Sequence, residues 1–238
     1  MKNALVTGCE GQLGKIFISE LLNLNYNVIG IDIEQKSKNK KIKYIKCDIT
    51  NSSELNEKLN PKIIKNIDLL INNAGVSVFT PFEDRTEKEI DYVFNVNLKA
   101  PIVLSQIIFN NFFKPQKKGC IVNIASIYGL VSGDMKIYSK GDRRTPEIYG
   151  STKAGIINLT KYLSAYMAPF NVRVNSISPG GVFNNQDQKF VEKYSNKVPL
   201  GRMARAEELK STLRFLIDEG SSYLTGENIV VDGGLTSL

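Results

Sequence analysis

Residues 4–14, ALVTGCEGQLG, decide the fold. An apolar run ends at Gly8, and positions 13–24 then carry apolar side chains at a helical spacing. Gly8, Gly11 and Gly14 occupy the turn between the two patterns. Glycines allow a tight turn and a close approach of the backbone to a pyrophosphate, and the helix N-terminus offers free N–H groups. The stretch therefore predicts a strand, a turn and a helix that bind a dinucleotide.

A second apolar run, residues 27–32, ends in an acidic residue, Asp32. In dinucleotide-binding folds a carboxylate at this position accepts hydrogen bonds from the adenosine ribose 2′-OH. It would also repel the 2′-phosphate of NADP, and the next residue is Ile33 rather than Arg. We therefore interpret Asp32 as a ligand of the ribose rather than as a simple turn residue. Asp32 favours NAD as the cofactor, although the nearby Lys36 and Lys38 keep NADP open.

The remaining apolar runs and helical patterns alternate along the whole chain. Five more strands are predicted at residues 42–47, 67–71, 120–125, 172–177 and 229–231, and helices at 52–59, 87–113, 149–167 and 206–217. This alternation indicates an α/β fold, a doubly wound parallel Rossmann-type sheet with helices on both faces. We expect one domain over residues 1–238, with a kink at Pro101.

Composition excludes several classes of protein. The chain has 238 residues, of which 42% are hydrophobic and 23% charged, so global disorder is excluded. No apolar run reaches bilayer length and the opening residues are too short for a signal-peptide core, so we expect a cytoplasmic protein. The absence of histidine excludes a His-based triad and HExxH zinc chemistry. The three cysteines are far apart and form neither a CxxC pair nor a disulfide framework.

The net charge of +7 raises the question of a nucleic-acid partner. Much of the excess lies in lysines between residues 36 and 46, and no aromatic residue interrupts this run before Tyr44. Single-strand binders interleave cations with aromatic side chains. The run therefore favours a solvated loop, and we expect neither nucleic acid nor a membrane as a partner.

Tyr149 and Lys153 are four residues apart at the start of a predicted helix, so they share a face. A free tyrosine has a pKa of about 10 and is a poor acid or base at neutral pH. A cation about 4 Å away in a partly buried site favours the phenolate by up to ~4 kcal/mol, which is roughly three pKa units. The pair can supply the proton chemistry that histidine cannot supply here; the alternative is a surface helix pair.

With these and further motifs, the chain resembles the compact branch of the short-chain dehydrogenase/reductase family over nearly its full length. The resemblance rests on motifs in the family's order: Thr7-Gly8 with Gly11 and Gly14, Asp48, the NNAG of residues 72–75, Asn97, Ser126, Tyr149-x-x-x-Lys153, Pro179-Gly180, and residues 223–226 and 231–234. The spacing of the first glycines is that of the extended branch, for whose substrate domain the chain is too short. Asn184 stands where many members have a Thr that bonds the carboxamide.

The resemblance implies a role for each of four residues. Tyr149 would be the general acid/base, and Ser126 would polarise the substrate oxygen. Lys153 would hold the nicotinamide ribose and lower the pKa of Tyr149. Asn97 would position the water of a proton relay. Hydride passes directly between nicotinamide and substrate carbon, so no metal is implied.

The resemblance also implies the cofactor contacts and the assembly. The expected cofactor-binding residues are Thr7, Gly8, Gly11, Gln12, Leu13, Gly14, Asp32, Asp48, Ile49, Asn73, Ala74, Gly75, Tyr149, Lys153, Pro179, Gly180 and Val182. A homotetramer or homodimer is expected, with the helices from Glu87 and Tyr149 across one two-fold axis and the segment near Val230 at another.

The gap of 23 residues between Ser126 and Tyr149 is longer than the dozen or so usual in the compact branch. Residues 130–148 are therefore an expected insertion near the active site, and residues 180–203 an expected substrate-binding loop region. The insertion resembles that of reductases from flagellin-modification and surface-sugar pathways. We expect contacts to an anionic substrate from Tyr138, Arg143, Arg144 and Arg202, since arginine forks suit phosphate and carboxylate. The alternative is a solvated surface excursion.

The resemblance implies an NAD(P)-dependent oxidoreductase that acts on a secondary alcohol or ketone of a small molecule, a sugar or nucleotide sugar. A second candidate is a 3-oxoacyl-(acyl carrier protein)-type reductase, but that chemistry usually takes NADPH and Asp32 weighs against it. A non-catalytic dinucleotide sensor or scaffold is a candidate of another class. The intact set of Asn97, Ser126, Tyr149 and Lys153 argues against it.

Overall fold

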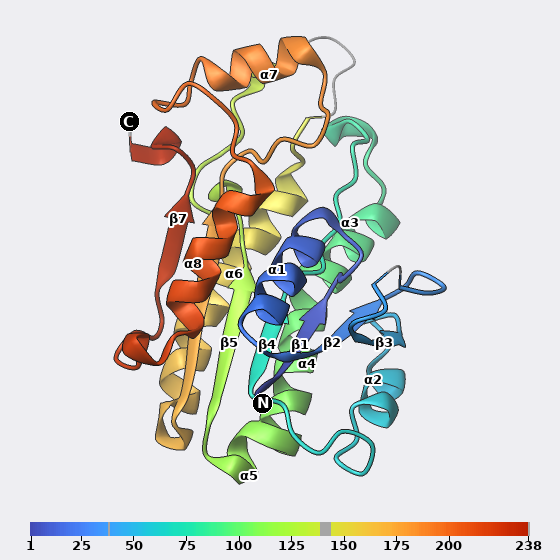
Figure 1. Cartoon of the computed structure of the whole chain (residues 1–238). Helices are drawn as coiled ribbons and strands as arrows, with labels where there is room; N and C mark the ends of the chain where they lie inside the picture. The colour runs from blue at the N-terminus through green and yellow to red at the C-terminus, as the bar shows by residue number, and fades with distance from the viewer. Residues whose placement is uncertain (38, 139–143, 238) are drawn as a thin grey trace.

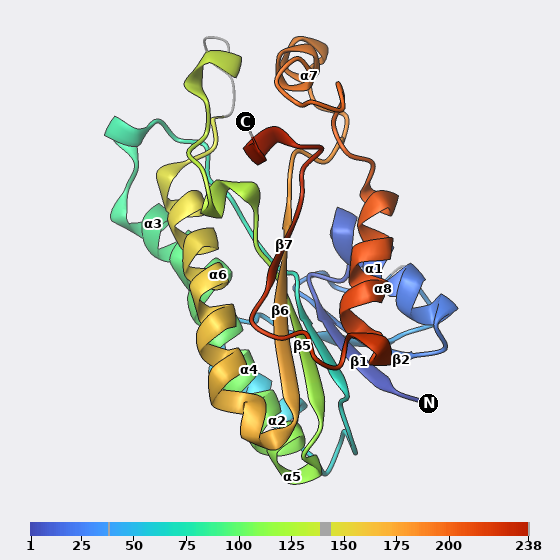
Figure 2. The ribbon, with the colours of Figure 1, turned by 90° about the vertical axis from the view of Figure 1, so that its left-hand side faces the viewer.

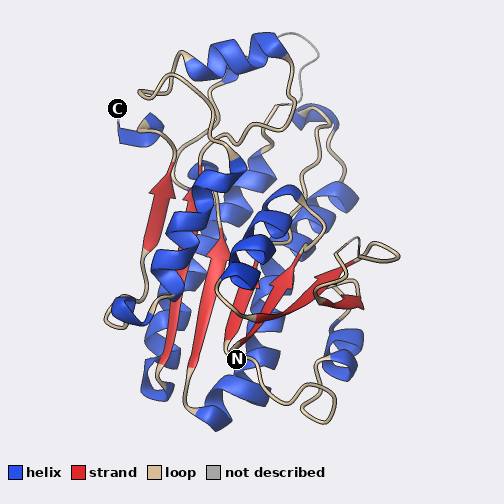
Figure 3. Ribbon diagram, viewed as in Figure 1, coloured by secondary structure: helices blue, strands red, loops and turns tan. Residues whose placement is uncertain are grey.

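The computed structural model describes residues 1–37, 39–138 and 144–237. Within these ranges the strands form one seven-stranded sheet in the order β3-β2-β1-β4-β5-β6-β7, and every pairing is parallel (Figure 3). The strands are β1 (Asn3–Thr7), β2 (Asn27–Asp32), β3 (Lys43–Lys46), β4 (Leu69–Asn72), β5 (Gly119–Ile124), β6 (Val172–Pro179) and β7 (Asn228–Val231). The predicted doubly wound parallel sheet is confirmed.

Helices cover both faces of the sheet (Figures 1 and 2). One face packs against α1 (Gln12–Asn23) and α8 (Leu209–Ile217), and the other against α2 (Ser52–Lys58), α4 (Ala100–Ile108) and α6 (Glu147–Met167). In β1, Leu5 belongs to the core of the second face and its neighbour Val6 to that of the first. Burial on both faces explains why the strands read as continuous apolar runs rather than alternating ones.

The long helix predicted from Glu87 is continuous but not uniform. It runs through α3 (Glu87–Phe94), α4 and α5 (Lys114–Gln116), which are joined by π-helical turns at Asn95–Lys99 and Phe109–Phe113. The irregular turn expected at Pro101 lies just before it, because proline has no N–H to donate to the preceding turn. π-Turns are frequent at functional sites, and the first of these carries Asn97.

The stretch Glu87–Gln116 is long and apolar enough to cross a bilayer by length and composition, which the sequence reading did not anticipate. In the fold it is a core helix. Leu104, Ile108 and Phe113 are at most 1% exposed and pack against the sheet. Burial of this kind accounts for its apolar character.

The two segments expected to be irregular both contain helix. The insertion forms a 3-10 turn at Met135–Ile137, and α6 begins at Glu147, two residues before its predicted start. Residues 180–203 contain α7 (Gln188–Ser195), whose N-cap Asp187 accepts hydrogen bonds from two backbone N–H groups. We call α7 and the described residues 130–138 and 144–146 the cap; it lies beyond the carboxyl edge of the sheet (Figure 2).

Candidate active site

A cavity of about 740 Å³ opens at the carboxyl ends of the central strands. The sheet order reverses between β1 and β4, and ligands of open α/β sheets bind at such a switch point. Sixteen predicted residues line the cavity: Gly8, Gly11, Gln12, Leu13, Asp32, Asp48, Ile49, Asn73, Ala74, Gly75, Ser126, Tyr149, Lys153, Pro179, Gly180 and Val182. The structure thus brings most of the expected cofactor and catalytic positions together in one cleft; Thr7, Gly14 and Asn97 are not among its lining residues.

The glycine turn fits a phosphate group because its glycine positions have no room for a side chain. Gly8 has φ +63°, and a Cβ there would lie 2.8 Å from the Ala74 Cα. A Cβ on Gly14 would lie 2.1 Å from the Gly8 carbonyl oxygen. Gly14 therefore packs against the backbone of the turn and does not line the cavity. The turn leads into the N-terminus of α1, whose free N–H groups suit a pyrophosphate.

Thr7 is also a support rather than a lining residue. Its side chain is buried, and its Oγ1 accepts hydrogen bonds of 3.0 Å from the backbone N–H groups of both Asn73 and Ala74. The Asn73 side-chain amide donates in turn to the carbonyl oxygens of Thr7 and Gly8. These bonds fasten the turn after β1 to the segment after β4, and so fix the two sides of the cleft.

The end of β2 presents carboxylates to the cavity. The Asp32 Oδ2 accepts a hydrogen bond of 2.9 Å from the Glu10 N–H, and its Oδ1 accepts one from the Ile33 N–H. Glu10 and Glu34 line the same cavity, which the sequence reading missed. The position of Glu10 inside the glycine turn was the available signal. On the far side, the Asp48 carboxylate accepts from the Thr50 N–H and hydroxyl.

Tyr149 and Lys153 lie on consecutive turns at the start of α6, facing the end of β5. The Lys153 Nζ donates a 2.7 Å hydrogen bond to the Ile124 carbonyl oxygen and lies 5.6 Å from the centroid of the Tyr149 ring. The Ser126 side chain lies near enough to the Tyr149 hydroxyl to lower its pKa by hydrogen bonding. A tyrosine, a serine and a lysine thus meet at one point of the cleft, as expected from the sequence.

The electrostatics differ from the expectation that Lys153 lowers the pKa of Tyr149. In the free protein, burial raises the pKa of Tyr149, and only the hydrogen bond with Ser126 acts in the opposite direction. Burial also lowers the pKa of Lys153 to about 8. Its ammonium is directed to the Ile124 carbonyl, so desolvation outweighs the benefit expected from the cation.

Asn97 shapes the loop after β4 instead of lining the cavity. It is 1% exposed; its Oδ1 accepts from the Val76 N–H at 2.8 Å, and its Nδ2 donates to the Val76 carbonyl at 2.9 Å. A Cβ on Gly75 would lie 3.6 Å from both the Asn97 Oδ1 and the Lys153 Nζ. Asn97 is therefore adjacent to Lys153, with its amide engaged by the backbone.

The predicted substrate contact Tyr138 is used inside the cap. Its hydroxyl is hydrogen-bonded with the Thr145 Oγ1 at 2.8 Å, and its ring stacks on Phe190 of α7 with centroids 5.7 Å apart. Tyr194 of α7 accepts a 2.5 Å hydrogen bond from the Gly181 N–H. Tyr138 thus braces α7 and does not line the cleft, because burying an aromatic ring between two segments stabilises both.

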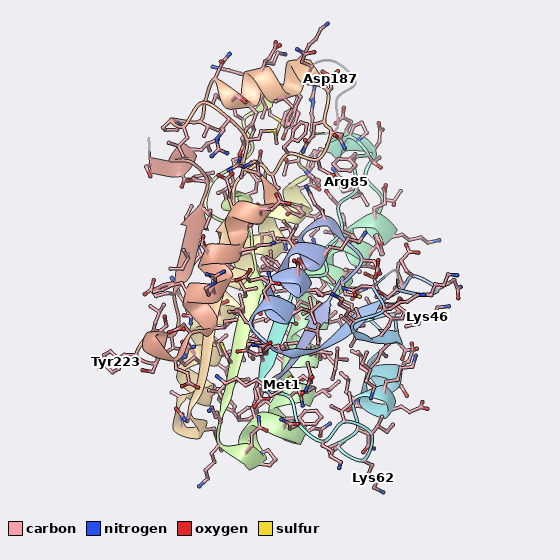
Figure 4. All side chains as sticks on the ribbon, in the orientation of Figure 1. Met1, Lys46, Lys62, Arg85, Asp187 and Tyr223 are labelled. Carbon is pink, nitrogen blue, oxygen red and sulfur yellow. The ribbon has the colours of Figure 1, made fainter. Side chains whose placement is uncertain are left out.

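The predicted arginines are distributed differently. Arg202 forms a double hydrogen bond with Glu208, with both N–O distances 2.7 Å, so its fork is occupied away from the cleft. Arg144 is exposed just before α6, and Arg143 lies outside the described residues. Arg85, which the sequence reading did not single out, is buried and donates to Glu147 in the first turn of α6. Figure 4 labels Arg85 at the cap end of the molecule, the end where Asp187 lies.

Comparisons with known proteins show the family. Residues 25–236 match the family described as enoyl-(acyl carrier protein) reductase. A 3-oxoacyl-(acyl-carrier-protein) reductase of Buchnera aphidicola subsp. Baizongia pistaciae is 33% identical over 98% of this chain and 97% of its own length. The chain belongs to the short-chain dehydrogenase/reductase family. It is an NAD(P)-dependent oxidoreductase of that family.

Two further relatives of this short-chain dehydrogenase are informative. The crystal structure of a short-chain dehydrogenase from Leptospira borgpetersenii with bound NAD+ is 44% identical, with a TM-score of 0.93, over 99% of this chain and 92% of that one. A 2-dehydro-3-deoxy-D-gluconate 5-dehydrogenase of Dickeya dadantii is 30% identical over 98% of this chain and 94% of its own length. The glycines of the turn, which leave room for close backbone approach, and the acid at the end of β2 fit a nicotinamide dinucleotide in this chain too.

Proposed function

We propose that this chain is an NAD-dependent reductase or dehydrogenase that interconverts a secondary alcohol and a ketone on a sugar or nucleotide sugar in the cytoplasm. One observation carries the proposal: Asp32, Ser126, Tyr149 and Lys153 line a single cavity. Asp32 selects the dinucleotide, Ser126 and Tyr149 act on the substrate oxygen, and Lys153 holds the nicotinamide ribose. Because these groups share one cleft, a non-catalytic sensor has little support.

The chemistry divides between the cofactor and the protein. The bound nicotinamide supplies or accepts the hydride. Ser126 hydrogen-bonds to the substrate oxygen, and Tyr149 gives that oxygen its proton in reduction and takes it back in oxidation. Burial raises the pKa of Tyr149, so the hydroxyl is protonated at neutral pH and ready to act as the acid. Lys153, fixed on the Ile124 carbonyl, carries a positive charge 5.6 Å from the centre of the Tyr149 ring below pH 8 or so.

The substrate class has two candidates. The D-gluconate derivative handled by the Dickeya relative is a sugar acid, and Arg144, exposed beside α6, offers an arginine fork for such an anion. Together with Asp32, which suits NAD, this favours a sugar-derived substrate. The 33% identity with the Buchnera reductase favours a 3-oxoacyl thioester as the second candidate.

A homodimer or homotetramer is also proposed. The stacked rings of Tyr162 and Tyr166 lie 6.0 Å apart on the outer face of α6 and are 63% and 57% exposed. Val230 on the edge strand β7 is partly exposed as well. Exposed aromatic side chains of this kind are typical of association surfaces. Light scattering is expected to give a particle of at least twice the 26.6 kDa chain mass, and a stable monomer at micromolar concentration would contradict this.

A panel assay tests the activity. Ketoses, sugar acids, nucleotide sugars with a keto group and a 3-oxoacyl thioester are each offered with NADH and with NADPH, and oxidation is followed at the nicotinamide absorbance band. Consumption of NADH with a sugar-derived ketone is expected. Turnover of the thioester alone would move the assignment to the second candidate. A uniform preference for NADPH would overturn the NAD assignment.

A further inference from the structure

Glu10 occupies an unusual place in the glycine turn. It lies between Gly8 and Gly11, lines the cofactor cavity, and its backbone N–H donates to the Asp32 Oδ2 at 2.9 Å. Its side chain is only 10% exposed. Two acidic residues, one from the turn and one from the end of β2, therefore meet at the corner where a carboxylate receives the adenosine ribose.

The Glu10 carboxylate is held in that corner by two other residues. The Ser37 hydroxyl donates a 2.5 Å hydrogen bond to its Oε1, and the Lys15 ammonium lies 3.9 Å from its Oε2. Lys15 is itself 53% exposed, so water screens its charge and it offsets that of Glu10 only in part. The carboxylate is thus fixed in position and keeps a net negative field.

Neighbouring groups respond to this field. Burial raises the pKa of the Tyr44 hydroxyl to about 12, with contributions in the same direction from Asp32 and Glu10. Burial likewise raises the pKa of the Cys9 thiol to about 12, and the same two carboxylates add to the effect. A third acid, Glu34, lines the cavity at this end. Further negative charge is therefore unfavourable there.

We infer that Glu10 is a second determinant of dinucleotide choice, which acts beside Asp32 to exclude the 2′-phosphate of NADP. The inference rests on the proposed preference for NAD. Asp32 gains hydrogen bonds with ribose hydroxyls, whereas Glu10 contributes repulsion of the extra phosphate, and discrimination improves when a repulsive element accompanies an attractive one. Lys36 is exposed and does not line the cavity, and Lys38, the other lysine that kept NADP open, lies outside the described residues.

A purely structural role for Glu10 is the competing explanation. The Ser37 hydrogen bond ties the glycine turn to the loop after β2, so loss of Glu10 would loosen the whole corner. Loosening weakens binding of NAD and NADP by the same factor, whereas loss of repulsion strengthens binding of NADP alone. The two roles therefore predict opposite changes in NADP affinity.

The test is calorimetric titration of the wild-type chain, Glu10→Gln and Ser37→Ala with NAD, NADP, 5′-AMP and adenosine 2′,5′-bisphosphate. The last two ligands differ only by the 2′-phosphate. Glutamine keeps an oxygen that accepts from Ser37 but removes the charge. Ser37→Ala is the matched control, since it removes the anchor and keeps the charge.

Glu10→Gln should bind NADP and adenosine 2′,5′-bisphosphate roughly three- to tenfold tighter, the effect of removing about one kcal/mol of repulsion. Its affinity for NAD and 5′-AMP should stay within about twofold, and the gain should shrink between about 50 mM and about 500 mM salt because screening weakens repulsion. Ser37→Ala should leave the ratio of NAD to NADP affinity unchanged.

The inference would be overturned if Glu10→Gln changed the affinities for both members of each ligand pair by the same factor. It would also be overturned if Ser37→Ala altered the ratio of NAD to NADP affinity as much as Glu10→Gln does. The proposed NAD preference fails separately, if the wild-type chain binds NADP as tightly as NAD. Even then the two fragment ligands still decide the role of Glu10, because its charge acts on the 2′-phosphate directly.

Discussion

The cofactor cleft and the cap are built by different means. The cleft is formed by the backbone of the glycine turn and the strand ends, and the Thr7 hydroxyl fastens this backbone to the segment after β4. The cap is made by side chains: Tyr138 stacks on Phe190, and Asp134 pairs with Lys197. A backbone-built site needs particular residues at fixed spacings, whereas a side-chain-built cap needs only complementary partners. The sequence of the cofactor cleft is therefore more constrained than that of the cap.

Tyr149→Phe should break the chemistry and leave the cleft intact. The variant keeps the ring and loses only the proton donor, so kcat should fall roughly 10²- to 10⁴-fold while the Kd for NAD stays within about twofold. Nicotinamide absorbance with a substrate found in the panel, beside calorimetry with NAD, measures both. Retention of a near-normal rate would remove Tyr149 from the acid/base role.

The buried lysine of the cleft should be visible in the pH dependence of stability. Burial lowers the pKa of Lys153 to about 8 from an ordinary value of 10.5, so above pH 8 the unfolded chain binds more protons than the folded one. The free energy of unfolding of the wild type, minus that of Lys153→Met, should therefore rise by about 2–3 kcal/mol from pH 8 to pH 10 or so.

Urea unfolding of the two proteins in parallel measures this difference, and the subtraction removes the titration of the other lysines. Below pH 8 the difference should be flat, because Lys153 is protonated in both states. A difference that stays constant across the whole range would show that Lys153 titrates normally.

Thr7 tests how firmly the backbone of the cleft is fastened. Thr7→Val removes the oxygen that accepts from the Asn73 and Ala74 N–H groups, so the free energy of unfolding should fall by about 1–3 kcal/mol. Thr7→Ser keeps that oxygen and should lose less than about half as much. A larger loss for Thr7→Ser than for Thr7→Val, measured by denaturant unfolding, would point to the methyl group rather than the hydroxyl.

Arg202 should have the smallest effect on turnover. Its fork is occupied by Glu208, so Arg202→Ala should change the substrate KM by less than about twofold. The Arg202 hydrogen bond holds the pKa of Glu208 at about 2, and in the variant that pKa should rise toward its ordinary value. NMR titration of the carboxyl group reads this directly. A large rise in KM would instead return Arg202 to the substrate site.

Sequence predicted the cleft well because its motifs are backbone requirements. Gly8, Gly14 and Thr7 are needed wherever the turn approaches the neighbouring strand this closely, and such needs appear as fixed residues at fixed spacings. Asp32, Ser126, Tyr149 and Lys153 follow strand ends or open a helix, so parallel topology alone brings them together.

The cap and the electrostatics could not be predicted in the same way. Tyr138 stacks on Phe190, which lies more than fifty residues further along the chain, and no local sequence pattern predicts such a contact. Arg202 was expected to contact an anionic substrate, but its guanidinium donates two hydrogen bonds to the Glu208 carboxylate instead. The pKa of Tyr149 depends on how deeply the ring is buried, which residue spacing does not contain.

Removing the contact between the insertion and α7 tests most directly whether the cofactor cleft and the cap are independent. Tyr138→Ala removes the ring that stacks on Phe190, and Tyr138→Phe keeps it as the matched control. For Tyr138→Ala we predict a Kd for NAD within about threefold of the wild type, because the cleft is fastened to the sheet, and a substrate KM raised about tenfold or more. Tyr138→Phe should stay near wild type in both. A Kd for NAD that rises as much as the substrate KM would contradict the account.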